Sequence, residues 1–423
     1  MTYSDHPFLE HPPATASTTP STAAPRSIDV RSLPKHAVTN LDMDVTEACN
    51  LACVYCFKSE LYGRHMSLDA MRKTFEWFIA ASHGATRVNV NFMGGEPTMR
   101  WREIESFVPW ARRRAQRSGK QVSFSMTSNL TLWTNEIRQF VDDYGFGVLM
   151  SIDGCPAIQD KQRPAKSGKK MSSVIEHWAR SMLRTRPRST ARMTLHPTNI
   201  MYLVESIDYL AGIGFREITI SASDYEAWSD QDFDALESAL REIVCFVRQS
   251  YDRQDPVSLT VWNYLIERLV RHRLSSGDNG IERIDSPCGA GKGYMMVDYT
   301  GDIWPCHRFD GADTDAGARG AFRLGNIYTP GFNDELQRAF LEFDHSKYFK
   351  SSCRSCPVEP VCGGYCPAAN LQEAGNIYTP HDNYCRWAQA MYRSAVSLFE
   401  GCERDGHLAE LLDRTAGTVT DGR

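Results

Sequence analysis

The chain has 423 residues, a length that accommodates two or three domains with a buried core. Its formal net charge is −5, so the composition gives no basic excess and we expect no nucleic-acid partner. No stretch approaches the ~18 continuous apolar residues that span a bilayer, and the N-terminus lacks a signal-peptide pattern. We therefore expect a cytoplasmic protein without a membrane partner, in which thirteen cysteines indicate metal binding rather than disulfides.

Residues 1–36 are rich in Pro, Thr, Ser and Ala, so we predict a disordered tail, with a partner-docking tail as the alternative. Residues 37–228 then alternate short strand patterns with helical patterns. The predicted strands are Leu41–Val45, Val88–Phe92, Val122–Thr127, Val148–Ile152, Arg192–Leu195 and Glu217–Ser221. The predicted helices are Leu68–Ala81, Trp101–Arg117, Asn135–Tyr144, Ser173–Arg184 and Leu203–Ile213. Six such units predict an α/β fold with a parallel sheet, a partial (β/α)6 barrel too short to close.

The remainder of the chain divides into three predicted parts. Residues 229–285 contain two bridging helices, Asp232–Gln249 and Val261–Leu274. Residues 286–390 are dense in cysteine and poor in long periodic segments, which is typical of a small domain held together by metal ligands. A closing helix is predicted over Arg386–Glu400. We assign residues 391–423 to a C-terminal part that contains most of this helix and a tail.

Three cysteines, Cys49, Cys53 and Cys56, lie in one short loop directly after the first predicted strand. They supply three of the four ligands that a [4Fe-4S] cluster needs, and one iron is left open for a small chelating molecule. The alternatives are a zinc knuckle or ordinary buried thiols. Zinc usually takes four protein ligands in paired C-x2-C units, and no fourth ligand lies nearby. We therefore favour a cluster at the C-terminal mouth of the sheet, where α/β folds place active sites.

The spacing of these cysteines resembles the signature of the radical S-adenosylmethionine (radical SAM) superfamily. The resemblance implies that the open iron binds the amino and carboxylate groups of S-adenosylmethionine (SAM), which an electron then cleaves to a 5'-deoxyadenosyl radical. Three further segments, ending the second, third and fourth strands, look like the family's GGE, TSN and SxDG elements, although each alone is an ordinary turn. The SAM contacts implied in this way are Tyr55, Phe57, Gly94, Gly95, Glu96, Ser128, Asn129, Ser151, Asp153 and Arg192.

Seven later cysteines resemble the SPASM domain, the auxiliary-cluster module of peptide- and protein-modifying radical SAM enzymes. The resemblance implies two auxiliary [4Fe-4S] clusters. The outer cluster would be held by Cys353, Cys356, Cys362 and Cys385, and the inner cluster by Cys288, Cys306 and Cys366. Seven thiolates are one short of two fully ligated clusters. The inner cluster is therefore expected to have an open iron or a non-cysteine ligand.

His307 follows Cys306 directly, at the position where anaerobic sulfatase-maturing enzymes carry an Asp that acts as a base. This departure counts against sulfatase maturation. His307 would itself serve as a catalytic base near neutral pH, or would only hydrogen-bond a cluster sulfur. The segments 288–309 and 324–327 look closest to maturases of ribosomally made peptides.

These resemblances imply a radical SAM oxidoreductase that removes a hydrogen from a precursor peptide and installs an intramolecular cross-link. An external donor such as flavodoxin or ferredoxin would supply the electron. Fewer than fifty residues precede Cys49, so we expect no leader-binding domain, which favours a carbon–carbon cyclophane over a thioether. The alternatives are a protein-maturing enzyme that forms formylglycine or a protein-derived quinone, and a non-enzymatic electron carrier or zinc scaffold. A carrier or scaffold would need neither the Glu96 segment nor the open three-cysteine site.

Overall fold

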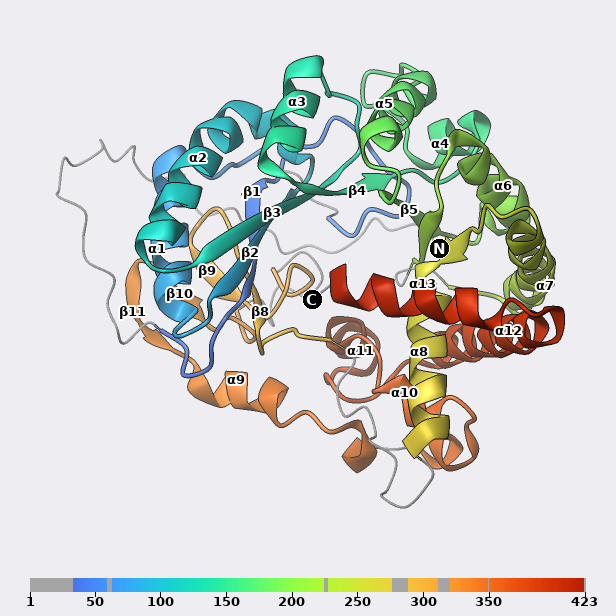
Figure 1. The fold of residues 1–423 in the computed structure, drawn as a ribbon. Coiled ribbons are helices and arrows are strands. Elements are labelled where there is room, and N and C mark those ends of the chain that lie inside the picture. The colour runs from blue at the N-terminus through green and yellow to red at the C-terminus, as the bar shows by residue number, and fades with distance from the viewer. Residues whose placement is uncertain are drawn as a thin grey trace, which may run out of the picture.

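The structure is a computed structural model, and it describes residues 33–58, 63–223, 227–275, 288–310, 320–348 and 350–421. The predicted disordered tail over residues 1–36 lies almost entirely outside these described residues. A curved sheet is wrapped on its outer side by an arc of helices, and the C-terminal helices gather at the opposite side of the molecule (Figure 1).

All six predicted strands of the N-terminal half are present, each lengthened at most by a few residues. They are β1 (Asn40–Thr46), β2 (Arg87–Gly94), β3 (Gln121–Ser128), β4 (Gly147–Ser151), β5 (Thr190–Leu195) and β6 (Glu217–Ala222). They pair in sequence order and in parallel, and the two-residue strand β7 (Ser258–Leu259) extends the sheet beyond β6. The sheet does not close on itself, which confirms the prediction of a partial barrel.

The outer helices begin and end where local sequence dictates. They are α1 (Leu68–Ala81), α2 (Trp101–Arg117), α3 (Asn135–Tyr144), α4 (Pro156–Gln162), α5 (Ser172–Thr185) and α6 (Leu203–Ile213), with 3-10 turns η2 (Pro97–Arg100) and η3 (Ile200–Tyr202). Helix α1 starts at Ser67, whose side chain accepts a hydrogen bond from the Ala70 amide. Helix α3 starts in the same way at Thr134 and ends at Gly145, which has a left-handed backbone conformation. The sequence pattern missed only the short helix α4.

The cysteine-rich region is joined to the barrel through the sheet itself. Its strands are β8 (Tyr294–Val297), β9 (Asp302–Trp304), β10 (Gly325–Asn326) and β11 (Thr329–Phe332). Strand β8 pairs in parallel with β1, so that Leu41 lies opposite Met295, and one sheet runs in the order β11-β10-β9-β8-β1-β2-β3-β4-β5-β6-β7. Sequence analysis assigned no strand here, because runs of two to four residues are too short to show a period.

The helices that follow β6 in sequence complete the described part of the fold. They are α7 (Asp230–Asp252), α8 (Thr260–Ser275), α9 (Asp334–Leu341), α10 (Glu359–Cys362), α11 (Pro367–Ala374), α12 (Asp382–Asp405) and α13 (Leu408–Asp421), with 3-10 turns η4 (His345–Tyr348) and η5 (Ser351–Ser355). Helix α12 packs against α7 and α8, and the indole N–H of Trp262 donates to the Ser394 hydroxyl at 2.8 Å. Among the described helices, none is both long and apolar enough to cross a membrane.

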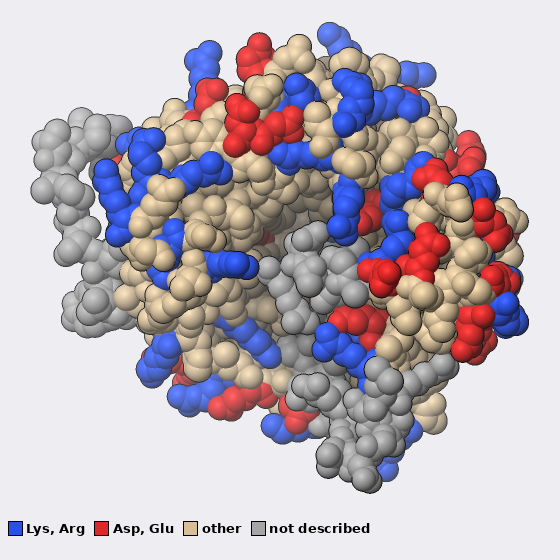
Figure 2. All heavy atoms as spheres, in the orientation of Figure 1, with Lys and Arg blue, Asp and Glu red and all other residues tan. Residues whose placement is uncertain are grey.

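Two hydrophobic clusters hold this arrangement. The larger lies between the sheet and the outer helices and extends to α7, α8 and α12, and its phenylalanines Phe75, Phe92 and Phe107 meet edge to face. The smaller lies in the cysteine-rich region around Phe309 and Phe340. On the face seen in Figure 2, Lys and Arg side chains are interspersed with Asp and Glu, so this face presents no field of a single sign.

Candidate active site

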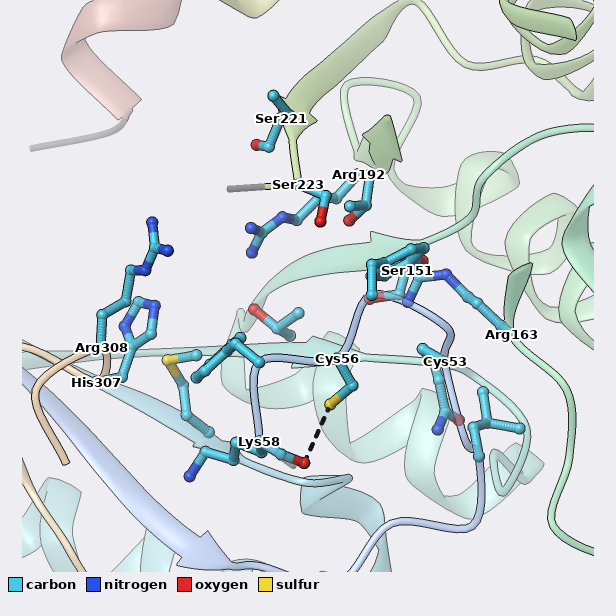
Figure 3. A pocket seen from close by; sticks show the side chains of 18 of the residues that line it. Cys53, Cys56, Lys58, Ser151, Arg163, Arg192, Ser221, Ser223, His307 and Arg308 are labelled. Atoms are coloured by element: carbon cyan, nitrogen blue, oxygen red, sulfur yellow. Dashed lines mark hydrogen bonds between the residues drawn. The ribbon is translucent and has the colours of Figure 1, made fainter. Parts of the chain in front are cut away.

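The loop that carries Cys49, Cys53 and Cys56 follows β1 at the C-terminal edge of the sheet. The Leu51 amide donates to the Cys49 sulfur at 3.5 Å, and the Cys56 sulfur lies 3.7 Å from the carbonyl oxygen of Lys58 (Figure 3). Burial raises the pKa of Cys53 to about 12, with Arg163 lowering it and Asp153 and the neighbouring cysteines adding to the rise. Burial also raises the pKa of Cys49. These two thiols would therefore stay protonated without a metal, and a bound cluster would supply the positive charge that holds them as thiolates.

The same three thiols are a donor set suited to an iron–sulfur cluster. In a [4Fe-4S] cluster each cysteine binds a different iron, and three cysteines leave the fourth iron open. The chemistry of this donor set therefore fits the iron–sulfur prediction.

Gly94 and Gly95 hold the cysteine loop by direct backbone contact. The Gly95 amide donates to the carbonyl oxygen of Thr46 at 2.7 Å, and the next amide, of Glu96, donates to that of Ala48 at 2.9 Å. A Cβ atom on Gly94 would lie 2.1 Å from the Thr46 oxygen, and one on Gly95 would lie 2.3 Å from the Ala48 oxygen. Gly94 also has a φ of +138°, which residues with side chains rarely adopt. The glycine pair is thus required for the loop to sit against β2.

Glu96 is buried and ties the end of β2 to the end of β3. Its Oε1 accepts from the Thr98 hydroxyl at 2.6 Å and the Ser128 hydroxyl at 2.9 Å, and its Oε2 accepts from the Asn129 amide at 2.7 Å. Burial raises the pKa of Glu96, although these hydrogen bonds lower it. A carboxylate oxygen accepts two or more donors, so Oε2 retains capacity for the ammonium group of a ligand.

Asn129 connects this network to the cysteine loop. Its side-chain amide donates to the Asn50 side chain at 3.1 Å, and its Nδ2 also lies 3.9 Å from the Cys49 sulfur. Its side-chain oxygen accepts from the Thr131 hydroxyl at 2.6 Å. The residues predicted from the third strand therefore orient the loop as well as facing its sulfurs.

Asp153 is a buried junction between the cysteine loop and the fourth and fifth strands. Arg163 binds it through two hydrogen bonds of 2.9 and 3.0 Å, the Thr194 amide donates to it at 2.9 Å, and the Tyr55 hydroxyl donates to the same carboxylate. Burial raises the pKa of Tyr55 well above its usual range, with Asp153 adding to the rise and Arg163 opposing it. Protein groups thus occupy the Asp153 carboxylate, and Tyr55 is fixed by it in the cysteine loop.

We expect Asp153→Asn to lower the free energy of unfolding by about 3–5 kcal/mol, because it leaves the Arg163 guanidinium buried without its counter-charge. Urea denaturation followed by tryptophan fluorescence measures this. As a control, Asp69→Asn removes the exposed ion pair with Lys73 and should cost less than about 1 kcal/mol. Equal losses in the two variants would show that the buried pair contributes nothing beyond an exposed one.

A cavity of about 440 Å³ opens above the cysteine loop, a size within the range of small-molecule sites. It is lined by most of the residues that sequence analysis selected. These are Cys49, Cys53, Cys56, Tyr55, Phe57, Gly94, Gly95, Glu96, Asn129, Ser151, Arg192, His307 and Cys366. Ser128 and Asp153 lie behind this lining. We call this cavity the chamber.

Figure 3 shows how the chamber is arranged. Arg192, Ser221 and Ser223 project from the ends of β5 and β6 on one side, and His307 and Arg308 project from the cysteine-rich region on the other. Burial lowers the pKa of Arg192, whose guanidinium has no hydrogen bond or ion pair within the described part of the chain. Its side chain is therefore available to an anionic group bound in the chamber.

Sequence reasoning missed several residues that line the chamber, among them Lys58, Ser221, Ser223, Arg308, Tyr365, Tyr384 and Trp387. Lys58 is buried between Asp44 and Asp310, at 2.5 and 2.9 Å. Burial raises the pKa of Asp44 to about 6, although Lys58 lowers it. This ion cluster joins β1, the cysteine loop and the segment after Cys306. The one sequence signal for a role of Lys58 was its position two residues after Cys56. That position does not distinguish Lys58 from any other lysine.

Several of the seven later cysteines influence one another electrostatically. Burial raises the pKa of Cys306 well above its usual range, and the nearby Cys366 and Cys288 contribute to the rise. Burial similarly raises the pKa of Cys385 to about 11, with further contributions from Cys362 and Cys353.

Burial also raises the pKa of Cys362, and the nearby Cys356 contributes to that rise. The inner and outer ligand sets that the SPASM resemblance implies remain a prediction. Of the predicted inner set, Cys366 lines the chamber, and its sulfur accepts from the Arg308 side chain at 3.5 Å.

His307 lines both the chamber and a second cavity, which lies along one face of the sheet. Its Nδ1 lies 2.9 Å from Asp42 and 2.8 Å from the Tyr294 hydroxyl, which also donates to Asp42. Asn91 donates to the other oxygen of Asp42 at 2.8 Å. These contacts fix the ring with its Nδ1 toward β1, and its ring is also close to Phe57, with centroids 5.9 Å apart.

Comparisons with known proteins agree with this arrangement. The model of the radical SAM superfamily matches residues 43–210, and that of SPASM, an iron–sulfur cluster-binding domain, matches residues 288–357. The serine-type anaerobic sulfatase-maturating enzyme of Klebsiella aerogenes is 23% identical over 373 residues, covering 84% of each chain.

Two solved structures share the fold. Native anSMEcpe with bound AdoMet and Cp18Cys peptide is 18% identical with a TM-score of 0.67, and the match covers 90% of this chain and 99% of that one. SuiB of Streptococcus suis bound to its precursor peptide SuiA is 15% identical with a TM-score of 0.54, covering 82% and 76%. At these identities the structural likeness establishes the fold.

Proposed function

From the premise that this chain carries a radical SAM domain followed by a SPASM domain, we propose that it cross-links side chains of a ribosomally made precursor peptide. It is an enzyme that acts on peptides or proteins, and its cofactors are SAM and [4Fe-4S] clusters. The cross-link of the proposal is a carbon–carbon cyclophane, with a thioether as the next choice. A cytoplasmic setting, where thiols stay reduced, belongs to the same proposal.

When bound, the cluster and SAM supply a radical that removes a hydrogen atom from the substrate. The chain's own residues provide the site. In the proposal, Glu96 accepts from the SAM ammonium through Oε2. Arg192 binds the anionic group of SAM and Ser151 binds a hydroxyl group of SAM. Tyr55 and Phe57 pack beside the bound cofactors. The chamber walls exclude water, which would otherwise quench a reactive intermediate.

One observation supports a cross-link that involves an aromatic side chain. A third cavity, of about 330 Å³, adjoins the chamber on another side. The chamber and this third cavity share Tyr365, Tyr384 and Trp387 in their linings. Trp228 and Phe233 complete its aromatic wall. Cyclophane formation needs an aromatic ring beside the reacting carbon, and aromatic walls favour binding of such a ring. Formylglycine formation acts on a small Cys or Ser side chain and does not require an aromatic-walled cavity beside the chamber.

The alternative is maturation of a sulfatase, which the similarity to the Klebsiella aerogenes enzyme favours. His307 argues against it, because it stands directly after Cys306, where the sulfatase-maturing family carries an Asp. The hydrogen bonds of His307 with Asp42 and Tyr294 support a positioned imidazole rather than an exposed carboxylate at this point.

Anaerobic assays of the reconstituted protein separate these functions. With SAM and a chemical reductant, we expect 5'-deoxyadenosine, and its absence would remove the radical chemistry altogether. Precursor peptides co-expressed with the chain should lose two hydrogens per cross-link and give no product with an aldehyde-specific hydrazide. A hydrazide adduct on a Ser- or Cys-containing sulfatase peptide would instead establish the alternative and overturn the cross-linking proposal.

A further inference from the structure

The cysteine loop is paired along its outer edge with a second segment of chain. The Val54 amide donates to the Gln162 carbonyl at 3.0 Å, the Ala52 amide to that of Pro164 at 2.8 Å, and the Lys166 amide to that of Asn50 at 3.0 Å. Residues 50–54 and 162–166 therefore run antiparallel, with a bridge between Leu51 and Ala165. Whatever binds to residues 161–170 thus lies directly beside the loop of the N-terminal cluster.

This second segment, residues 161–170, carries four exposed lysines and no acidic residue, and we call it the lysine loop. The lysines are Lys161, Lys166, Lys169 and Lys170, and none of them forms an ion pair with any residue that the structure describes. Some other exposed basic side chains of the barrel do pair, as Lys73 does with Asp69 and Arg180 with Glu176. The chain as a whole carries a net charge of −5, whereas the lysine loop is locally positive.

Exposed apolar side chains lie on the cysteine loop and on two segments that contact it. Val54 is 49% exposed between Cys53 and Cys56, and Met99 and Leu132 are 41% and 39% exposed. Met99 follows Glu96, whose amide binds the cysteine loop, and Leu132 follows Thr131, whose hydroxyl accepts from Asn50 in that loop. Small apolar groups with charges beside them are typical of transient contacts between electron-transfer proteins.

We propose that the lysine loop, together with Val54, Met99 and Leu132, is the docking surface for a small acidic one-electron carrier protein. The inference rests on the proposed function, which requires an external reductant for the N-terminal cluster. One electron passes from the reduced centre of the carrier to that cluster, which changes from [4Fe-4S]2+ to [4Fe-4S]+, and the carrier is oxidised by one electron. No atom or proton is exchanged.

Charge complementarity decides in favour of this occupant. An acidic carrier is repelled by the net charge of the chain, and unpaired lysines at the point of electron entry both attract it and fix where it lands. Lysine side chains that make no ion pairs with the described residues keep their charge available to the carrier. The contact would be weak and sensitive to salt, as exposed ion pairs are.

The test uses the reconstituted holoenzyme and a flavodoxin as the probe. The variant Lys169→Glu/Lys170→Glu reverses two charges just before α5, where acidic residues are tolerated because they face a helix N-terminus. The matched control Arg113→Glu/Arg117→Glu reverses two exposed charges near the C-terminal end of α2, at the opposite edge of the sheet. We expect the dissociation constant for flavodoxin at 50 mM salt to rise about tenfold in the lysine variant and to stay within twofold in the control.

Two further readouts keep the inference separate from the proposed function. Carbodiimide cross-linking of the parent should join flavodoxin carboxylates to one of the four lysines of the lysine loop, and dithionite-driven 5'-deoxyadenosine formation should be unchanged in the lysine variant. Equal dissociation constants in parent and lysine variant, or cross-links confined to other lysines, would overturn the docking surface. If dithionite yields no 5'-deoxyadenosine even in the parent, the proposed function fails, and the dissociation constants still decide the docking proposal.

Discussion

Replacing Cys53 with Ala is expected to remove about four irons per chain and to reduce SAM cleavage by roughly a thousandfold or more, because the N-terminal cluster then keeps only two protein ligands. Cys53 lines the chamber and is the most strongly perturbed thiol of its loop, with its pKa raised to about 12 by burial. A site of this kind holds its cluster only when all three thiolates replace the protons that burial favours.

Iron analysis and electron paramagnetic resonance of the dithionite-reduced protein measure the loss, and 5'-deoxyadenosine formation measures the activity. The control is Cys245→Ala, since Cys245 is an exposed cysteine on α7 that fits none of the cluster spacings. Its iron content and activity should match those of the parent. Unchanged iron and activity in Cys53→Ala would show that the loop is not the catalytic cluster site.

Gly95→Ala is expected to have the second largest effect, although it adds a single methyl group. The new Cβ would lie 2.3 Å from the Ala48 carbonyl oxygen and 2.6 Å from its carbonyl carbon. Both are backbone atoms, so no side-chain rotation relieves the overlap and the cysteine loop must move away from β2. We expect a stability loss of about 1–3 kcal/mol, as for other overpacked sites, together with loss of the N-terminal cluster.

The matched control for this change is Gly84→Ala, where an added Cβ meets no atom within 4 Å. Binding of SAM to the anaerobically reconstituted proteins, measured by equilibrium dialysis, should be at least about tenfold weaker in Gly95→Ala and unchanged in Gly84→Ala. If Gly95→Ala binds iron and SAM like the parent, the contact between the glycine pair and the cysteine loop does not position the site.

Glu96 illustrates where prediction from sequence stops. Its position after a strand and a glycine pair indicated an acceptor for the SAM ammonium, and the structure shows that most of its capacity serves the protein through Thr98, Ser128 and Asn129. Asp153 was predicted in the same way and is occupied by Arg163, Thr194 and Tyr55. The residue types follow from the motif, but their hydrogen-bond partners come from other strands. The cofactor roles assigned to both residues therefore remain predictions.

The alternation of strand and helix patterns was sufficient, without further information, to predict the α/β partial barrel and its six parallel strands, while the two kinds of cysteine site that the spacing indicates remain predictions. Such features are local, because they depend on residues within a few positions of one another. Only the tertiary structure decided that β8 extends the sheet beside β1, that Lys58 joins Asp44 to Asp310, and that aromatic residues near 228 and 384 share one cavity wall. Contacts between residues more than a hundred positions apart depend on how the elements pack, and no local pattern records that packing.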